Sequence, residues 1–363
     1  MAPIYLDYNA STPIDPAVAA AMKPFLADHF GNPSSGHWAA APAKAALEKA
    51  RGQIAALLGC EDDEVVFTSG GSEANNLALK GVYYARRDSG DHIITTRIEH
   101  PAITAPCRFL ERLGARITYL PVDRFGHVAP DDLGRAITSR TILISIMHAN
   151  NEIGTIQPIE ECARIAREHG VLFHTDAAQS VGKIATDVNG LGVDLLSIAG
   201  HKLYAPKGVG ALFVRRGVFL EPLIHGAGHE SGRRAGTESA LLAVGLGKAC
   251  ELARDLTSMD RVRALRDHFW GELQSHLEMQ IWEALNTGIV KVESDANQIS
   301  IPSVLNYLGS LNVKDVRLEA GPGLISSFID LNLIDEYIFY IAPKVLGNKA
   351  NSFYTNKNLE GIL

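Results

Sequence analysis

The chain has few cysteines and no long apolar run, and both absences exclude whole classes of protein. Its 363 residues include four cysteines, without a Cys-x-x-Cys pair: Cys60, Cys107, Cys162 and Cys250. This spacing suggests neither a disulfide framework nor a zinc site. No apolar run approaches the ~18 residues that a membrane span needs, and the first residues lack the basic and apolar stretches of a secretory signal. We therefore expect a protein of the reducing cytoplasm that does not enter a membrane.

An excess of positive charge is also missing. The net charge is −7, from 34 basic and 41 acidic side chains, which gives no electrostatic reason to expect nucleic acid as a partner. Internal repeats and low-complexity linkers are absent as well. The hydrophobic share of 46% is ordinary for a globular protein, and the length suffices for two domains around a large core.

The sequence does contain, over residues 15–255, short apolar runs that alternate with helical patterns. Leu47, Ile54 and Leu58 share one face of an expected helix, which Gly59 would end. The apolar runs expected to be strands are 65–67, 92–94, 117–120, 142–146, 171–173, 195–198 and 211–214, the last two as an adjacent pair. Such alternation predicts an α/β fold with a mostly parallel sheet.

Two of these runs are followed by groups suited to the chemistry of pyridoxal phosphate. Lys202 comes just after the run 195–198, and an amine at the end of a buried strand can form a Schiff base with a carbonyl compound. Asp176 comes after the run 171–173, where a carboxylate can keep a pyridine nitrogen protonated. Asp176 could instead cap the segment that follows it. A lysine together with an acidic partner is what pyridoxal phosphate requires.

Other expected strand ends carry groups that each have an ordinary structural explanation. The segment 68–76, with Ser72 in it, can hold a phosphate or can be a capped helix start. His100 can stack on a ring and move protons or be structural. Asn151 can bond a phenolic oxygen, with Gln179 near Asp176, or belong to a turn. Open parallel sheets bind ligands at the carboxyl ends of their strands, so we do not expect all the ordinary explanations to hold together.

In this order, the motifs resemble the class V aminotransferase superfamily, and most of all its cysteine desulfurases and selenocysteine lyases. The resemblance runs from residue 4 to about 275, and its motifs are Ser-Gly-Gly-Ser-Glu-Ala-Asn-Asn (69–76), Glu-His-Pro (99–101), Asn-Asn-Glu-Ile-Gly (150–154), His-Thr-Asp-Ala-Ala-Gln (174–179) and Gly-His-Lys (200–202). It implies the large α/β domain of a pyridoxal-phosphate-dependent, aspartate-aminotransferase-like transferase, with a mostly parallel seven-stranded sheet.

The resemblance also implies a role for each site residue. Lys202 would carry pyridoxal 5′-phosphate as a Schiff base, Asp176 would pair with its ring nitrogen, and His100 would stack on the ring and, like Lys202, move protons. The other implied contacts are those of Asn151 and Gln179 with the phenolic oxygen, of Gly71, Ser72 and His201 with the phosphate, and of Thr237 with the phosphate of a partner subunit in a homodimer. The implied substrates are L-cysteine and L-selenocysteine, with sulfur passed on to an acceptor protein.

Several positions depart from the family pattern. Ala199 stands where a phosphate-binding serine is frequent, and the loop 226–230 reads Gly-Ala-Gly-His-Glu in place of Gly-Gly-Gly-Gln-Glu. His225 and His229 are four residues apart, but no third ligand is evident, so no metal is expected. No cysteine follows Cys250, although the family's nucleophilic cysteine lies in its C-terminal part. The four cysteines present do not resemble activated thiols, so we expect impaired sulfur transfer.

The last part of the chain resembles a different family, the reductase domain of riboflavin-biosynthesis deaminase/reductases. The resemblance starts at about residue 282 and is carried by the segments 301–305, 316–323, 333–337 and 341–347. We therefore divide the chain into a class V domain, 1–275, and an atypical, partial dihydrofolate-reductase-like α/β segment, 276–363, as a fused or rearranged gene would produce.

Three interpretations follow from this division. The first is an impaired cysteine desulfurase. The second is a selenocysteine lyase or another β-eliminating enzyme that does not need the missing thiol. The third is a protein that binds pyridoxal phosphate without turnover. A reductase dependent on NADPH is the least favoured function, because the tail begins after much of that domain's substrate-binding region.

Overall fold

The computed structural model describes residues 5, 7–285, 294–295 and 298–299, and the side chains of residue 5 and residues 7–272. The chain forms two compact units, Met1–Arg263 and Ala264–Leu363. Most of the reductase-like segment expected at 276–363 lies outside the described residues. No helix in the part of the chain that the structure describes is long and apolar enough to cross a membrane.

The first unit is built on a seven-stranded sheet with the order β1-β7-β6-β5-β4-β2-β3. Its strands are β1 (Val65–Thr68), β2 (His92–Thr96), β3 (Arg116–Leu120), β4 (Thr141–Ser145), β5 (Leu172–Asp176), β6 (Leu195–Ala199) and β7 (Gly210–Val214). Strands β2 to β6 pair in parallel, whereas β7 is antiparallel to both β6 and β1. The predicted α/β fold with a mostly parallel seven-stranded sheet is confirmed, and so is the adjacent pair β6–β7.

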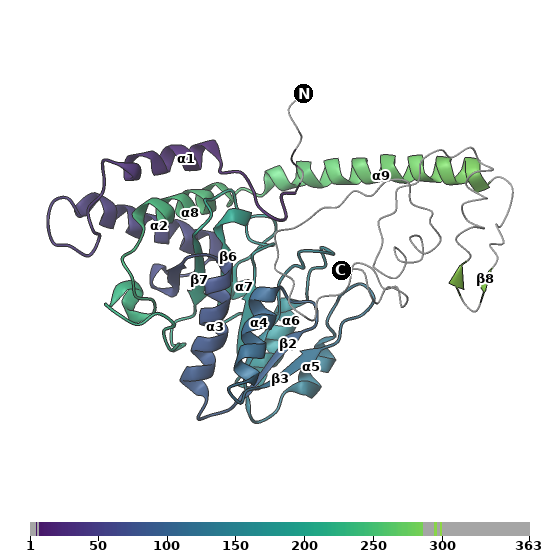
Figure 1. Ribbon diagram of the computed structural model, residues 1–363, viewed down its shortest axis with the longest axis horizontal. Coiled ribbons are helices and arrows are strands. Elements are labelled where there is room, and N and C mark those ends of the chain that lie inside the picture. The colour runs from purple at the N-terminus through teal and green to yellow at the C-terminus, as the bar shows by residue number, and fades with distance from the viewer. Residues whose placement is uncertain (1–4, 6, 286–293, 296–297, 300–363) are drawn as a thin grey trace, which may run out of the picture. The chain divides into compact units, whose positions relative to one another are not determined.

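Helices pack on both faces of this sheet because alternate strand residues point to opposite sides. On one face, Val66 and Ile93 pack with residues of α3 (Gly71–Arg86) and α4 (Pro101–Glu111), which lie side by side in Figure 1. On the other face, the neighbours Val65 and Ile94 belong to a larger apolar cluster. That cluster includes residues of α1 (Pro16–Met22), α2 (Ala41–Leu58), α5 (Pro130–Ala136), α6 (Ile159–Glu168), α7 (Val188–Leu191) and α8 (Ala240–Leu252).

Helix α2 ends where the sequence predicts. Leu47, Ile54 and Leu58 are buried on one face, and Gly59 adopts the left-handed conformation with φ 70° that glycine favours after a helix. The helix packs against α8 so closely that a Cβ at Gly247 would lie 2.6 Å from Cα of Ala50. The remaining elements are the short 3-10 helices η1 (Lys23–Leu26), η2 (Asp62–Glu64), η3 (Gly200–Lys202) and η4 (His229–Gly232), the helix α9 (Thr257–Leu285), and the strands β8 (Ser294–Asp295) and β9 (Gln298–Ile299).

The strand directions bring the predicted site residues to one edge of the sheet. Because β1 is antiparallel to β7 and β7 is antiparallel to β6, β1 runs in the same direction as β2 to β6. Gly210 pairs with Thr68 on one side and with Ala199 on the other. A Cβ at Gly210 would lie 2.7 Å from Cα of Gly70, so only glycine lets the turn after β1 approach the turn after β6.

Candidate functional site

Lys202 is the last residue of η3, directly after β6, and its amine is half-buried. Its Nζ donates a hydrogen bond to the backbone oxygen of Asn9. Burial lowers the pKa of Lys202, and the carboxylates of Asp7, Asp176 and Glu152 oppose this shift. A lowered pKa increases the neutral fraction of the amine, which is the form that attacks a carbonyl carbon.

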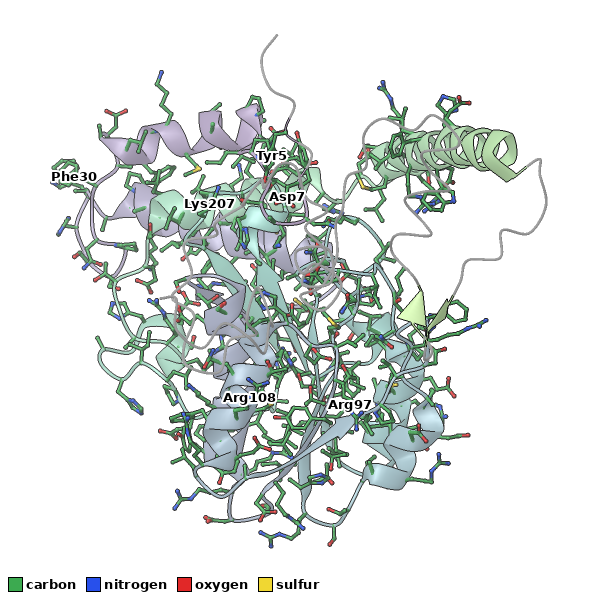
Figure 2. The ribbon with its side chains drawn as sticks, turned by 45° about the vertical axis from the view of Figure 1, so that its right-hand side comes forward. Tyr5, Asp7, Phe30, Arg97, Arg108 and Lys207 are labelled. Carbon is green, nitrogen blue, oxygen red and sulfur yellow. The ribbon has the colours of Figure 1, made fainter. Side chains whose placement is uncertain are left out.

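The N-terminal segment contacts residues 201–204, which we call the lysine turn because they include Lys202. The backbone nitrogen of Thr12 donates to the backbone oxygen of His201 at 2.8 Å, and its Oγ1 accepts from the backbone nitrogen of Tyr204 at 2.9 Å. Tyr204 has a positive φ of 58°, a strained conformation that these contacts support. Tyr5 and Asp7 lie side by side in the same segment (Figure 2), where the Tyr5 hydroxyl donates to the backbone oxygen of Asp7 at 2.7 Å. Sequence reasoning assigned these residues no role.

Asp176 ends β5 as a buried carboxylate with one hydrogen bond to each oxygen. Its Oδ2 accepts from Nδ2 of Asn75 at 2.6 Å, and its Oδ1 accepts from the backbone nitrogen of Ala178 at 3.0 Å. The bond from Ala178 is the local cap that the sequence analysis gives as the alternative role of Asp176. Asp176 therefore forms this cap, and its carboxylate also acts on Lys202. Burial raises the pKa of Asp176, while the two donors, His100 and Lys202 act to lower it.

His100 is the N-cap of α4, and its ring is exposed. Its Nδ1 accepts a hydrogen bond from the backbone nitrogen of Ala102 at 3.0 Å. The neutral ring therefore carries its proton on Nε2, which is free to donate. His100 interacts electrostatically with both Asp176 and His201, so the structure brings this predicted residue together with the predicted carboxylate and lysine turn.

Gln179 and Asn151 contact residues that also interact with Lys202. Nε2 of Gln179 donates to the backbone oxygen of Asn9 at 3.1 Å, the oxygen that Lys202 also contacts. Oε1 of Gln179 accepts from Lys183 at 2.9 Å. Nδ2 of Asn151 donates to Oε1 of its neighbour Glu152 at 2.7 Å, and Glu152 is one of the carboxylates that act on Lys202.

The predicted phosphate-binding residues Gly71 and Ser72 lie in the first turn of α3. Gly70 precedes the helix with φ 149°, and Ser72 is exposed in its first turn. Backbone N–H groups at the start of a long helix favour an anion. A Cβ at Gly71 would lie 3.0 Å from Cβ of Ala199, so Ala199 packs directly against this turn.

Thr237 is exposed and does not contact the lysine turn in any hydrogen bond among the described residues. It lines a cavity of about 210 Å³ together with Thr68, Ser69 and Gly208. The expected contact of Thr237 with a phosphate in the partner subunit stays a prediction.

The four cysteines occupy the environments that the sequence predicts. Cys107, Cys162 and Cys250 are buried, and Cys60 is partly buried. Burial raises the pKa of Cys60, Cys107 and Cys162 to about 12 and also raises that of Cys250. At neutral pH these thiols are protonated, so none is an activated nucleophile.

The two histidines of the glycine-rich loop have partners in the protein. Nε2 of His225 lies 3.2 Å from Oε1 of Glu221, and Nδ1 of His229 accepts from the backbone nitrogen of Gly236 at 3.2 Å. The described residues include no group of three or more His, Cys, Asp or Glu side chains that could hold a metal ion.

Glu99 is a buried carboxylic acid beside the predicted site that the sequence reasoning did not single out. It is buried beside His100, and its Oε1 accepts from Oγ1 of Thr96 at 2.7 Å and from the backbone nitrogen of Met147 at 3.0 Å. The side chain thereby ties the turn after β2 to the end of β4. Burial raises the pKa of Glu99 to about 8, so the carboxyl group is largely neutral in the folded protein at pH 7.

We expect Glu99→Gln to flatten the dependence of folding stability on pH. The unfolded state loses this proton near pH ~4.3, whereas the folded state keeps it up to about pH 8. Wild-type stability therefore falls as the pH rises through this window, on the order of 2–4 kcal/mol between pH 5 and pH 8. Urea unfolding at several pH values measures the effect. Glu111→Gln, at an exposed position of α4, is the control, and identical slopes for wild type and Glu99→Gln would contradict the prediction.

The residues at this edge fit pyridoxal 5′-phosphate. The half-buried amine of Lys202 can bind its aldehyde, and the buried carboxylate of Asp176 can hold its ring nitrogen. The start of α3 can hold its phosphate. Each group lies at the end of a different strand or directly after it, and all of them lie at the carboxyl edge, where such sheets bind ligands.

Comparisons with known proteins agree with this fit. The aminotransferase class-V family matches residues 4–314, and the RibD C-terminal domain family matches residues 271–360. The chain is 54% identical to cysteine desulfurase IscS of Dictyoglomus turgidum over 278 residues, which cover 76% of this chain and 70% of that protein. It is 52% identical to IscS of Methanosarcina thermophila, over 69% of this chain and 62% of that protein. The chain thus spans about two thirds of the length of these relatives.

Solved structures give the same result. A structure described as SspA in complex with cysteine has a TM-score of 0.67 and 47% identity, over 69% of this chain and 72% of that chain. A NifS-like protein has a TM-score of 0.72 and 38% identity, over 76% of this chain and 75% of that chain. Both resemblances expected from the sequence, to class V aminotransferases and to the riboflavin-biosynthesis reductase domain, are confirmed. The chain belongs to the aminotransferase class-V family, whose cysteine desulfurases depend on pyridoxal 5′-phosphate.

Proposed function

We propose that the chain is a cysteine desulfurase-type enzyme that removes sulfur from L-cysteine and releases L-alanine. The observation that carries the proposal is the grouping of Lys202, Asp176 and His100, whose charges act on one another at the carboxyl edge of the sheet. The names of the relatives, cysteine desulfurase IscS, support the reaction. The structure of SspA with cysteine supports the substrate class.

The chain's own residues bind the cofactor and move protons. When bound, pyridoxal phosphate supplies an aldehyde that condenses with amines and a ring that withdraws electrons from the bond being broken. Lys202 would hold the cofactor through Nζ and then serve as a base, with His100 donating from Nε2. Asp176, whose two donors favour the ionised carboxylate, would hold the proton on the ring nitrogen.

Other residues would complete the cofactor contacts. Asn151 and Gln179 would bond the phenolic oxygen, and the phosphate would be held by Gly71, Ser72 and His201 and by Thr237 from a partner subunit in a homodimer. Sulfur would pass to an acceptor protein in the cytoplasm. We keep the division into a class V domain, 1–275, and a fused reductase-like segment, 276–363, as a hypothesis.

We further propose that sulfur transfer by this chain is impaired. A desulfurase needs a thiolate that attacks the substrate sulfur. The four cysteines of the chain have raised pKa values and lie in buried or partly buried positions. None is suited to carry a persulfide.

Sulfide and alanine release from L-cysteine in the presence of a reductant tests both parts of the proposal. We expect bound cofactor and alanine formation well below that of the Dictyoglomus turgidum relative, with Lys202→Ala as the control without activity. Robust turnover that Lys202→Ala removes would refute the impairment. The absence of any cofactor binding would refute the function itself.

Two further hypotheses remain open because of the buried thiols. A selenocysteine lyase or another β-eliminating enzyme does not depend on the missing nucleophile, and selenide release from L-selenocysteine would then exceed sulfide release from L-cysteine. A protein that binds pyridoxal phosphate without turnover would show a visible cofactor absorbance band and form no alanine from either substrate.

A further inference from the structure

We infer that Asn75 is a positioning residue for cofactor binding, because it fixes the Asp176 carboxylate from the facing helix. The inference rests on the proposed function, in which Asp176 holds the ring nitrogen of pyridoxal phosphate. It concerns affinity for the cofactor and is independent of sulfur chemistry.

The contact joins two elements that are distant in the sequence. Asn75 lies in the second turn of α3, Asp176 lies at the end of β5, and 101 positions separate them. Nδ2 of Asn75 donates to Oδ2 of Asp176 at 2.6 Å, and the two residues are 1% and 6% exposed. The neighbours Ala74 and Leu77 are packed in the apolar layer between α3 and the sheet, so this turn of the helix is held in place.

Packing alone does not explain an amide at this position. Oδ1 of Asn75 is buried and has no hydrogen-bond partner among the described residues. A buried polar atom without a partner costs free energy, and an apolar side chain of similar shape would avoid that cost. The bond from Nδ2 to Asp176 is the interaction that accounts for an asparagine here.

The bond has a chemical consequence for the site. A carboxylate offers two acceptor positions on each oxygen, and Asn75 and the backbone nitrogen of Ala178 occupy one position on each. Both donors favour the ionised carboxylate, against the opposing effect of burial. One acceptor position on each oxygen remains for a proton held by the cofactor ring.

A double-mutant cycle on cofactor affinity tests the inference. The apo forms of wild type, Asn75→Leu, Asp176→Ala and the double variant are titrated with pyridoxal 5′-phosphate, and the dissociation constants are compared. A hydrogen bond to a charged group is worth a factor of about ten or more in affinity. We therefore expect Asn75→Leu to weaken binding at least ~10-fold in the wild-type background and by less than ~2-fold once Asp176 is alanine.

Asn189→Ala is the control, because this exposed amide donates to the backbone oxygen of Gly59 at 2.7 Å, outside the proposed site. Asn75→Ala serves as a second variant that suits a helix. Equal weakening in both Asp176 backgrounds, unchanged affinity, or failure of both Asn75 variants to fold without cofactor would assign Asn75 a structural role and overturn the inference. If the wild type itself does not bind the cofactor, the proposed function fails first.

Discussion

Lys202→Ala is expected to abolish covalent attachment of pyridoxal phosphate and to lower any product formation ~10²–10⁴-fold. The variant removes both the amine that binds the aldehyde and the base that moves protons. Among the lysines that the structure describes, Lys183 also has a pKa that burial lowers, to about 8, but its amine donates to Oε1 of Gln179 at 2.9 Å. The measurements are the absorbance of bound cofactor and the rate of alanine formation.

Lys207→Ala provides the control for this variant. Lys207, which is labelled in Figure 2, lies five positions after Lys202 and is exposed. We expect wild-type cofactor absorbance from Lys207→Ala. A Lys202→Ala protein that forms alanine at the wild-type rate would remove the basis of the proposed function.

Asp176→Asn is expected to stabilise the protein without cofactor and to weaken cofactor binding. Burial raises the pKa of Asp176, which means that the ionised carboxylate costs folding free energy at pH 7. Asparagine keeps the shape and loses the charge, and a flip of the Asn75 amide lets its unpaired Oδ1 accept from the new Nδ2, so we expect the apo protein to gain about 1–2 kcal/mol of stability. Cofactor affinity falls about 10-fold or more, because the proton on the ring nitrogen loses its charged partner.

Thermal unfolding of the apo protein and cofactor titration measure the two effects separately. Asp194→Asn is the matched control, since Asp194 lies just before β6, at the opposite edge of the sheet. Its Oδ2 accepts from the backbone nitrogen of Phe173 at 2.8 Å, and burial raises its pKa as well. We expect unchanged cofactor affinity in Asp194→Asn. A destabilised apo Asp176→Asn protein with unchanged affinity would contradict the role given to this carboxylate.

The sheet and the main site residues were predictable because both follow from local patterns. Apolar runs such as 142–146 identify buried strands, and the carboxyl ends of parallel strands meet at one edge. The lysine and the carboxylate were therefore found from their places after two runs. The family motifs then supplied expected cofactor contacts for residues such as Gln179, which stay predictions.

The end of β5 shows where the apolar pattern fails. The sequence predicted the strand only to residue 173, but β5 continues to Asp176. His174 is fully buried within it, with Nδ1 2.8 Å from Oγ of Ser145 and Nε2 3.0 Å from Oγ of Ser197. These bonds from the two neighbouring strands satisfy the ring, and burial lowers its pKa to about 3. A polar side chain buried in this way leaves no apolar signal.

Sequence reasoning also could not predict the contacts between segments that are distant in the chain. The bond from Asn75 to Asp176 and the hold of Thr12 on the backbone oxygen of His201 join residues more than 100 positions apart. Glu99 was noted only as part of a motif, because nothing local shows that its carboxyl group is buried. These three side chains support the predicted residues, and only the packed fold reveals them.

Borohydride reduction of the protein loaded with pyridoxal 5′-phosphate, followed by peptide mass mapping, addresses the attachment of the cofactor most directly. We expect a single reduced adduct, on the peptide that contains Lys202, and none in the Lys202→Ala protein. A colourless protein without any adduct, or an adduct on another lysine such as Lys183, would contradict the proposed site.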